Sequence, residues 1–344
     1  MGADQVLALE VVTADGRFRT ATATENEELF WAIRGGGGST YGVVTSVVYK
    51  AHPQIPISTL AFSITTGPTT NITADQFFGA LREYFIRFEG YADKGHYSYF
   101  FVLPAGDGQY SFRMSSWVAP NTTMDELKAE VAPLLEAMAA HGVVFETDFK
   151  GWDNFHDGWE YGFPLEAWGT GNVRQGSRLF PRKNWHDEKL LNDTWEAVRS
   201  VAEAGSIIIA FNIRNPPEYP DNAVNPAWRD VLCHCIMGSA WSYGTSEEEA
   251  SQRSWTVTHD WMPRWIKVSP GSGAYMSESD YMEPDWQQSF HGSNYPRLYA
   301  LKQKWDPFSV FYAQNAVGSE DWEMSGSIVG VPSQNSKLCR KPRS

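Results

Sequence analysis

The chain has 344 residues and a mass of 38.7 kDa, with 42% hydrophobic and 20% charged residues, the composition of a folded protein with up to three domains. Its formal net charge of −13 argues against nucleic acid or an anionic membrane surface as a partner. The sequence has no run of 18 apolar residues, which argues against a transmembrane helix, and no signal peptide is expected at its start. The 14% of aromatic residues suits a wide, aromatic-lined pocket for a small molecule.

The first part of the chain is predicted to form a strand hairpin and a short helix. Strands are expected at 6–12 and 17–22, on either side of an Asp-Gly turn. Thr24 and Glu27 have the spacing of a capping box, which predicts the start of a helix. Gly35 is expected to end that helix.

Four consecutive glycines, Gly35–Gly38, follow this helix and precede a strand predicted at 41–49. The run is not a P-loop, because no Gly-Lys-Ser/Thr follows it, and in the dinucleotide-binding fingerprint the glycines follow a strand. The helix before the run presents its negative C-terminal end, so an anion here must be held by peptide N–H groups of the loop. Two interpretations stay open: a helix C-cap and a cofactor cradle.

The middle of the chain shows the element order β-α-β-β-α-β, the split βαβ unit. The four strands are predicted at 58–65, 96–103, 109–118 and 143–149, and the two helices begin at the capping boxes Thr73–Gln76 and Thr123–Glu126. The same order recurs more faintly, with strands predicted at 174–180, 206–213, 229–237 and 273–276 and helices at 187–204 and 246–261. Two such halves predict an α+β fold, with a large antiparallel sheet backed by helices on one face.

Two further segments flank the second half. Residues 152–168 are too irregular for a helix and rich in aromatic side chains, so they are expected either to fold over a pocket or to pack between the halves. A helix is predicted to begin near Asn294, with Pro296 in its first turn, and to run to about Trp305.

The three cysteines do not predict a disulfide or a metal site. Cys233 and Cys235 lie two residues apart on one predicted strand, where neighbours on one face are about 6.5–7 Å apart, which is awkward for a disulfide. His234 would point to the opposite face of the sheet. We therefore expect buried thiols, and Cys339 has no obvious partner.

The predicted strand at 273–276 leads into polar residues that could carry chemistry. Tyr275 and Ser277 would share one face, so that a phenol and a hydroxyl project into one pocket. Glu278 reaches the same pocket only if the strand ends before it. A buried phenol or carboxylate can act as a general base, and the alternative is a solvated strand end. The eight histidines are expected to be structural.

Two long segments resemble the berberine bridge enzyme-like family of FAD-linked oxidoreductases. The first is LFWAIRGGGGSTYGVVT, from Leu29 to Thr45, and the second begins NYPRL at Asn294 and ends VGSEDW at Trp322. Two shorter segments, NPAWR at 225–229 and LCR at 338–340, look like the fungal branch.

This resemblance implies a fold of the vanillyl-alcohol-oxidase type, with a PCMH-type FAD-binding domain and a substrate domain. The expected parts are the C-terminal part of the FAD-binding domain at 1–55, the substrate domain at 56–285, a returning segment at 286–324 that packs on the FAD-binding domain, and a loosely ordered tail at 325–344.

The resemblance also implies the residues of the site. Tyr275 and Glu278 fall in a segment that lines the substrate pocket in relatives and are the catalytic candidates; no metal is expected. Contact with FAD is implied for Gly35, Gly36, Gly37, Gly38, Ser39, Tyr41, Gly42, Val43, Asn294 and Tyr295.

The sequence departs from the family in two places. Members usually carry an additional N-terminal half with the main pyrophosphate loop and the residues that bond FAD covalently, so no covalent attachment is expected here. Ser277 stands where relatives often have Asn. The family is often secreted, but the compartment of this chain is left open.

The expected function is therefore that of an FAD-dependent oxidoreductase, with a small-molecule substrate and O₂ as electron acceptor. An alcohol, a sugar or a secondary metabolite would fit as substrate. The alternative is a flavin-poor truncated relative that acts as a binding protein, or as an isomerase or cyclase that uses only the pocket.

Overall fold

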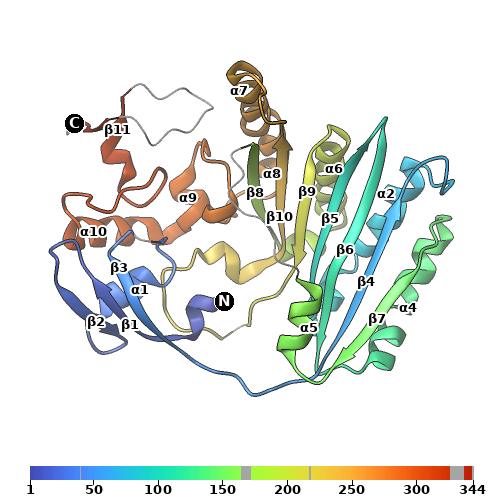
Figure 1. Cartoon of the computed structure of the whole chain (residues 1–344), viewed down its shortest axis with the longest axis horizontal. Coiled ribbons are helices and arrows are strands. Elements are labelled where there is room, and N and C mark those ends of the chain that lie inside the picture. The colour runs from blue at the N-terminus through green and yellow to red at the C-terminus, as the bar shows by residue number, and fades with distance from the viewer. Residues whose placement is uncertain (39, 164–171, 217, 326–336, 343–344) are drawn as a thin grey trace.

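The structure is a computed structural model that describes residues 1–38, 40–163, 172–216, 218–325 and 337–342. A large sheet with its helices forms one part of the molecule, and a small sheet with the C-terminal helices forms the other (Figure 1). Within the described ranges, no helix is both long and apolar enough to cross a membrane.

The large sheet is continuous and antiparallel throughout, which confirms the predicted fold class. Its strand order is β7-β4-β6-β5-β9-β10-β8. The strands are β4 (Ile57–Thr65), β5 (Tyr97–Gly106), β6 (Gln109–Pro120), β7 (Thr147–Trp152), β8 (Val173–Pro181), β9 (Ile207–Asn212) and β10 (Val231–Ala240).

Helices cover one face of this sheet and bury the larger of two hydrophobic cores against it. They are α2 (Ala74–Phe85), α3 (Phe88–Asp93), α4 (Met124–Ala140), α6 (Glu188–Glu203), α7 (Glu247–Thr256) and α8 (Met262–Val268), with a π-helical turn at Val257–Trp261 between the last two. Both predicted capping boxes form, at Thr73 for α2 and at Thr123 for α4. Cys233 and Cys235 are free, buried thiols in this core, as predicted.

The duplication is real, but its last strand is replaced. In the first half, the four strands lie in the sheet in the order β7-β4-β6-β5, which is fourth, first, third and second in the chain. In the second half, β9-β10-β8 are second, third and first in the chain, so they repeat this order in reverse. The fourth position of the second half is taken by residues 273–275, which run beside β8 with the Leu179 N–H donating to the Gly273 carbonyl at 2.9 Å. The predicted strand at 273–276 is therefore wrong, because the backbone turns into a 3-10 helix at Met276–Glu278.

The aromatic segment after β7 contains a helix that the sequence did not predict. Helix α5 (Phe155–Gly162) begins at Asn154, whose side chain accepts the Asp157 N–H. It packs on β4, β6 and β7, on the face that the long helices leave open (Figure 1). Residues 164–168 of this segment lie outside the described residues.

The small sheet has the order β2-β1-β3 and is built from the first part of the chain. Its strands are β1 (Val6–Val12), β2 (Phe18–Thr22) and β3 (Val43–Tyr49), and helix α1 (Glu27–Ile33) lies between β2 and β3 in the chain. The capping box predicted at Thr24 is wrong: the backbone N–H groups of Thr24 and Glu25 donate to the Thr22 hydroxyl, and the N-cap of α1 lies two residues later, at Asn26.

The C-terminal segment packs against the small sheet and α1 and completes the second hydrophobic core. It contains α9 (Trp286–His291) and α10 (Tyr295–Trp305), followed by the short paired strands β11 (Trp322–Met324) and β12 (Leu338–Arg340). The ammonium group of the buried Lys302 donates to the Thr40 carbonyl at 2.7 Å, to the Phe311 carbonyl at 2.7 Å and to the Asp306 carboxylate at 2.8 Å. Lys302 thus ties the glycine-rich loop to the C-terminal segment. The predicted domain boundaries themselves stay a prediction.

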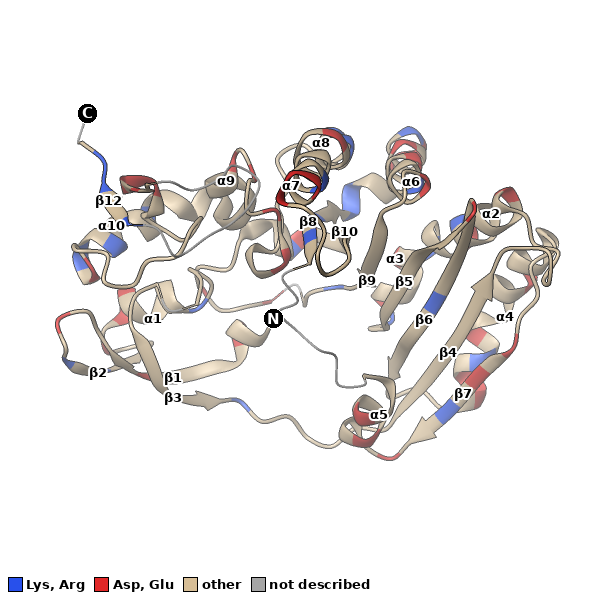
Figure 2. Cartoon of the chain, turned by 45° about the horizontal axis from the view of Figure 1, so that its top comes forward, with Lys and Arg blue, Asp and Glu red and all other residues tan. Residues whose placement is uncertain are grey.

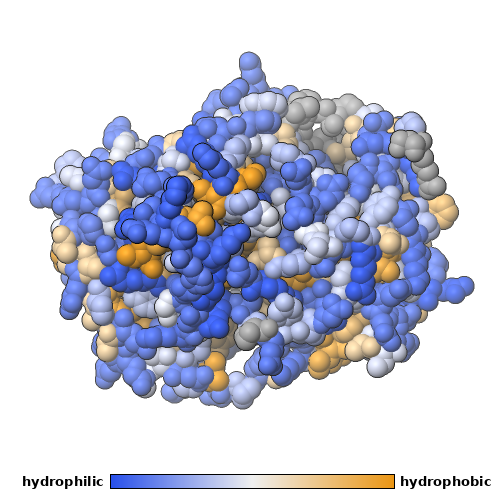
Figure 3. Space-filling view, turned by 180° about the vertical axis from the view of Figure 1, so that it is seen from behind, coloured by the Kyte–Doolittle hydropathy of each residue, from blue (hydrophilic) through white to orange (hydrophobic). Residues whose placement is uncertain are grey.

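Strand β3 is an edge strand with an unusually apolar, exposed surface. Its described strand partner is β1, and all seven of its residues are exposed, among them Val43, Val44, Val47, Val48 and Tyr49. Charged residues concentrate instead on the outer helices α6, α7 and α8 (Figure 2). The rear of the molecule is mostly hydrophilic, with separate small hydrophobic patches (Figure 3).

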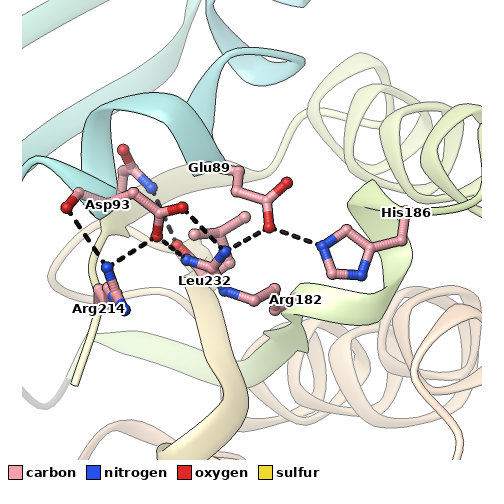
Figure 4. Close-up of polar contacts among 7 residues, drawn as sticks. Glu89, Asp93, Arg182, His186, Arg214 and Leu232 are labelled. Atoms are coloured by element: carbon pink, nitrogen blue, oxygen red, sulfur yellow. Dashed lines mark hydrogen bonds and ion pairs between the residues drawn. The ribbon is translucent and has the colours of Figure 1, made fainter. Parts of the chain in front are cut away.

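An ionic network joins the two halves of the large sheet on its helix side (Figure 4). Arg182 donates to Glu89 and to Asp93, Arg214 lies 3.0 Å from the Asp93 carboxylate, and His186 lies 2.6 Å from Glu89. The hydrogen bond from Arg182 lowers the pKa of Asp93. None of these residues lines the cavity described below.

Candidate functional site

A cavity of about 350 Å³ lies between the two parts of the molecule. It brings the glycine-rich loop and the segment around Tyr275 together, although they are far apart in the sequence. Its lining includes Gly35, Gly37, Gly38, Tyr275, Met276 and Ser277, and also Trp228, Phe290 and residues 1–3. Two groups of predicted site residues therefore face one space.

The four glycines divide into two pairs with different surroundings. A Cβ at Gly35 would overlap the backbone of Ala223 and Val224, and one at Gly36 would overlap the Ala32 carbonyl. At Gly37 a Cβ would meet Met276 across the cavity at 3.0 Å, whereas Gly38 has no atom within 4 Å of such a Cβ. The first pair closes the helix end against the 221–229 loop, as a helix C-cap would, and the second pair leaves backbone open to the cavity. The cofactor cradle stays a prediction.

Apart from the glycine run, the predicted cofactor-binding residues that the structure describes are not among those that line this cavity. The Tyr41 hydroxyl donates to the Leu298 carbonyl at 2.9 Å, Asn294 donates to the Val224 carbonyl at 3.0 Å, and the Tyr295 hydroxyl donates to Glu320. Gly42 packs on β1 and Val43 lies on the exposed strand β3. Ser39 lies outside the described residues. The role predicted for these six stays a prediction.

The turn at Met276–Glu278 positions the two catalytic candidates differently. The Tyr275 N–H donates to the Ser177 hydroxyl on β8 at 3.2 Å, and the Tyr275 side chain is 37% exposed at the cavity. The Glu278 N–H donates to the Tyr275 carbonyl at 2.9 Å. This turn directs Glu278 back toward the open face of the large sheet, where its carboxylate lies 3.8 Å from the Nε2 atom of His234 on β10.

Burial controls the electrostatics of Glu278. Its pKa is raised because burial disfavours the charged carboxylate. Burial, and after it the charge of Glu278, also raises the pKa of Tyr97 on β5, which places the Tyr97 phenol within electrostatic reach of the carboxylate. A carboxyl group with a raised pKa and a phenol beside a cavity are the features expected of an acid–base site.

His234 lies beside Glu278, with its Nε2 atom 3.8 Å from the carboxylate. The sequence predicts it on the face opposite Cys233 and Cys235, and it expects every histidine to be structural, so a role for His234 in the site is not among its predictions. The imidazole stacks on Phe211 at 5.4 Å between ring centroids and lies edge-on to Trp228 at 5.2 Å. The available signal was the alternation of β10: with the cysteines in the helix-covered core, the residue between them must face the pocket side.

Aromatic rings continue from His234 across the open face of the sheet. Tyr99 on β5 stacks on Phe211 with centroids 4.9 Å apart and planes 4° apart, and Tyr99 also stacks on Phe163 at 6.1 Å. The cross-strand pairs His234–Phe211 and Tyr99–Phe211 hold these rings in one row. The row forms an apolar wall beside Glu278. Among the described residues, no group of three or more His, Cys, Asp or Glu side chains is placed to hold a metal ion.

Comparison with known proteins gives matches along nearly the whole chain. Residues 274–318, which include Tyr275 and Glu278, match the family model described as berberine and berberine like. FAD-linked oxidoreductase patO of Aspergillus clavatus is 30% identical over 344 residues, which cover 99% of this chain and 57% of that protein. The bifunctional decalin synthase calF of Penicillium decumbens is 29% identical over 350 residues, covering 99% of this chain and 58% of that protein.

Among solved structures, the VAO-type flavoprotein MtVAO615 of Myceliophthora thermophila C1 superimposes with a TM-score of 0.84 at 27% identity. The match covers 98% of this chain and 60% of that one. These findings confirm the resemblance and the fold inferred from the sequence. The chain spans a little more than half the length of the relatives it matches.

Proposed function

Because the chain is a relative of the fungal FAD-linked oxidoreductases of berberine bridge enzyme-like type, we propose that it forms the substrate-facing part of an FAD-dependent oxidoreductase. The observation that carries this proposal is the cavity in which the open backbone of Gly37 and Gly38 faces Tyr275 and Met276. One wall of the cavity can hold a cofactor by its peptide groups, and the other offers a phenol and, behind it, a carboxyl group.

The open backbone at Gly37 and Gly38 is the feature of the described residues that fits a bound FAD. Gly38 has free space where a side chain would lie, and Gly37 leaves only the gap to Met276, so the ribityl–pyrophosphate part of FAD can approach the backbone closely. FAD bound here would supply the electron-accepting ring. The chain itself would orient a small-molecule substrate against Trp228 and Tyr275, and Tyr275 or Glu278 would accept the proton that the substrate loses on oxidation.

The proposal extends to an alcohol, a sugar or a secondary metabolite as substrate and to O₂ as final electron acceptor. The aromatic row of Tyr99, Phe211 and His234 supports a substrate with an apolar or flat portion. A second candidate is an isomerase or cyclase that uses the pocket without a redox step. The decalin synthase among the relatives supports this second candidate.

The test is FAD binding by the purified chain, followed through flavin fluorescence. We expect saturable, non-covalent binding with a Kd in the micromolar range or weaker, because much of the relatives' length has no counterpart here. Gly38→Val should weaken binding at least tenfold by filling the cavity. Gly151→Val on β7 is the matched control, since its Cβ also meets no atom within 4 Å, and it should bind as the parent does.

Two results would overturn the proposal. One is the absence of saturable FAD binding at roughly millimolar FAD, and the other is equal binding by the Gly38→Val variant and the parent. A flavin peptide recovered by mass spectrometry would contradict the non-covalent mode alone.

A further inference from the structure

A buried histidine nitrogen without a hydrogen-bond partner lies beside the proposed base. The Nε2 atom of His234 is buried and makes no hydrogen bond, and the Glu278 carboxylate is 3.8 Å away. We propose that His234 is a positioning residue for Glu278: its neutral imidazole donates the Nε2–H to the Glu278 carboxylate and so keeps that carboxylate able to accept the substrate proton. This inference rests on the proposed function.

The packing of His234 leaves its ring little freedom. The side chain is on strand β10, which lies between β8 and β9 in the large sheet, and the residue is 3% exposed. Phe211 stacks on the ring with planes 12° apart, while Trp228 and Tyr275 stand edge-on at 5.2 and 5.9 Å. None of these rings offers Nε2 a strong acceptor, so the carboxylate of Glu278 is the acceptor within reach.

The 3.8 Å separation is longer than a hydrogen bond. Glu278 lies at the end of the 3-10 turn, with its side chain still 22% exposed, so a small rotation of that side chain closes the gap. Hydrogen bonds of this kind are commonly long in unliganded sites and shorten when the site is filled.

The other groups that face Glu278 do not supply a positive charge. Tyr97 on β5 senses the charge of Glu278, and Tyr275, three residues earlier in the same segment, contacts the His234 ring. The cations of the adjacent strand β8 are engaged elsewhere: Arg178 donates to Ser269 and Ser289, and Arg174 donates to Ser254. A neutral donor is therefore what the described surroundings offer the carboxylate.

The protonation states agree with this geometry. Burial lowers the pKa of His234 to about 3, so its imidazole is neutral across the physiological range. Burial raises the pKa of Glu278, which lowers the ionised fraction of this carboxyl group at any given pH. A hydrogen bond from a neutral donor favours the carboxylate and opposes that shift. In the proposed step the proton leaves the substrate and arrives on a Glu278 oxygen, while His234 keeps its own proton.

The test compares His234→Leu with His234→Gln, whose amide N–H can reach the same position. The matched control is His96→Leu. His96 is also buried beside a carboxylate, with its Nε2 atom 3.2 Å from Glu130, but it is not part of the cavity. The first readout is the carboxyl titration of Glu278, taken as the infrared difference between each protein and its Glu278→Gln counterpart. The second is the pH dependence of anaerobic flavin reduction.

We expect the Glu278 titration and the acidic limb of the rate profile to move up by about one to two pH units in His234→Leu. His234→Gln should stay within about half a unit of the parent, and His96→Leu should not move either curve. An unchanged Glu278 titration in His234→Leu overturns the inference, and so does an equal shift in His96→Leu. If the parent reduces no flavin, the proposed function fails, but the infrared titration still decides the role of His234.

Discussion

The burial of Glu278 makes the stability of the chain depend on pH in a definite direction. Its pKa is raised by burial in the folded state, so the folded chain binds this proton more tightly than the unfolded chain does. The resulting cost is absent below the ordinary glutamate pKa of about 4.3 and grows as the pH rises through the folded value. We predict that Glu278→Gln raises the Tm by roughly 2–3 °C at pH 8 and leaves it unchanged at pH 4.

Calorimetry of the two proteins across this range checks the prediction. A gain that is equally large at pH 4 would show that the amide packs better and that ionisation plays no part.

Tyr275 is predicted to act on the reaction with little effect on the fold. Its side chain is 37% exposed, and its described backbone hydrogen bonds, with Ser177 and with Glu278, do not use the phenol. In a flavin-loaded preparation, Tyr275→Phe should slow flavin reduction by about 10²–10⁴-fold, the usual contribution of general acid–base catalysis, with little change in substrate affinity. Anaerobic stopped-flow absorbance measures this rate. A rate within about threefold of the parent, or a loss of thermal stability in its place, would assign Tyr275 to packing.

At the level of single residues, the sequence could predict which segments meet but not which atoms. Tyr275 and the glycines Gly37 and Gly38 were assigned to one site, and they line one cavity. The contribution of His234 could not be predicted in the same way, because it depends on the turn at Met276–Glu278 that sends Glu278 toward β10. The alternation of residues along a strand predicts which face each side chain takes, but it does not predict the residue at which the strand ends in a turn.

Helix α10 is held to the glycine-rich loop by one buried charge. Burial lowers the pKa of Lys302, and the hydrogen bond from its ammonium group to Asp306 opposes that shift. Lys302→Met removes the donor shared by Thr40, Phe311 and Asp306 and leaves the Asp306 carboxylate buried without its cation. We predict a loss of about 3–5 kcal/mol in the free energy of unfolding, measured by urea denaturation.

The double variant Lys302→Met/Asp306→Leu tests the cause of that loss. It removes the buried carboxylate together with its partner, so it should recover part of the stability lost by Lys302→Met alone. If the double variant is less stable than the single one, the hydrogen bonds that the Val310 and Phe311 N–H groups donate to the Asp306 carboxylate matter more than the charge.

At the scale of elements, the capping-box pattern predicted the start of a helix correctly where no neighbouring side chain bound the same region of backbone. The capping boxes at Thr73 and Thr123 formed because their threonine hydroxyls were free to accept the helix N–H groups. The one predicted at Thr24 did not form, because the Thr22 hydroxyl accepts the N–H groups of Thr24 and Glu25 in a turn that precedes the helix. Helix α5 was missed because its stability comes from packing on β4, β6 and β7, which a short aromatic sequence does not reveal.

At the scale of the whole molecule, the 221–229 loop connects the two parts of the molecule and lines the cavity between them. Trp31 and Arg34 of the small part donate to Asp221, at 2.9 and 2.8 Å, while Arg229 forms a salt bridge with Asp4 at 2.8 Å. The duplicated halves of the large sheet could be predicted from the order of elements. This junction could not, because polar contacts between residues about 200 apart leave no periodic signal.

The exposed edge of β3 has a consequence for how the chain behaves in concentrated solution. An uncovered strand rich in valine is a template on which another backbone can add a further strand, and the valine side chains then shield one another from water. We predict reversible, concentration-dependent self-association, visible as a rising weight-average mass in sedimentation equilibrium. Val47→Lys should reduce it severalfold by placing a charge in the middle of the strand, whereas Thr45→Lys should be less effective because Thr45 lies among polar groups near Glu10. If the chain stays monomeric at all concentrations, strand β3 does not mediate self-association.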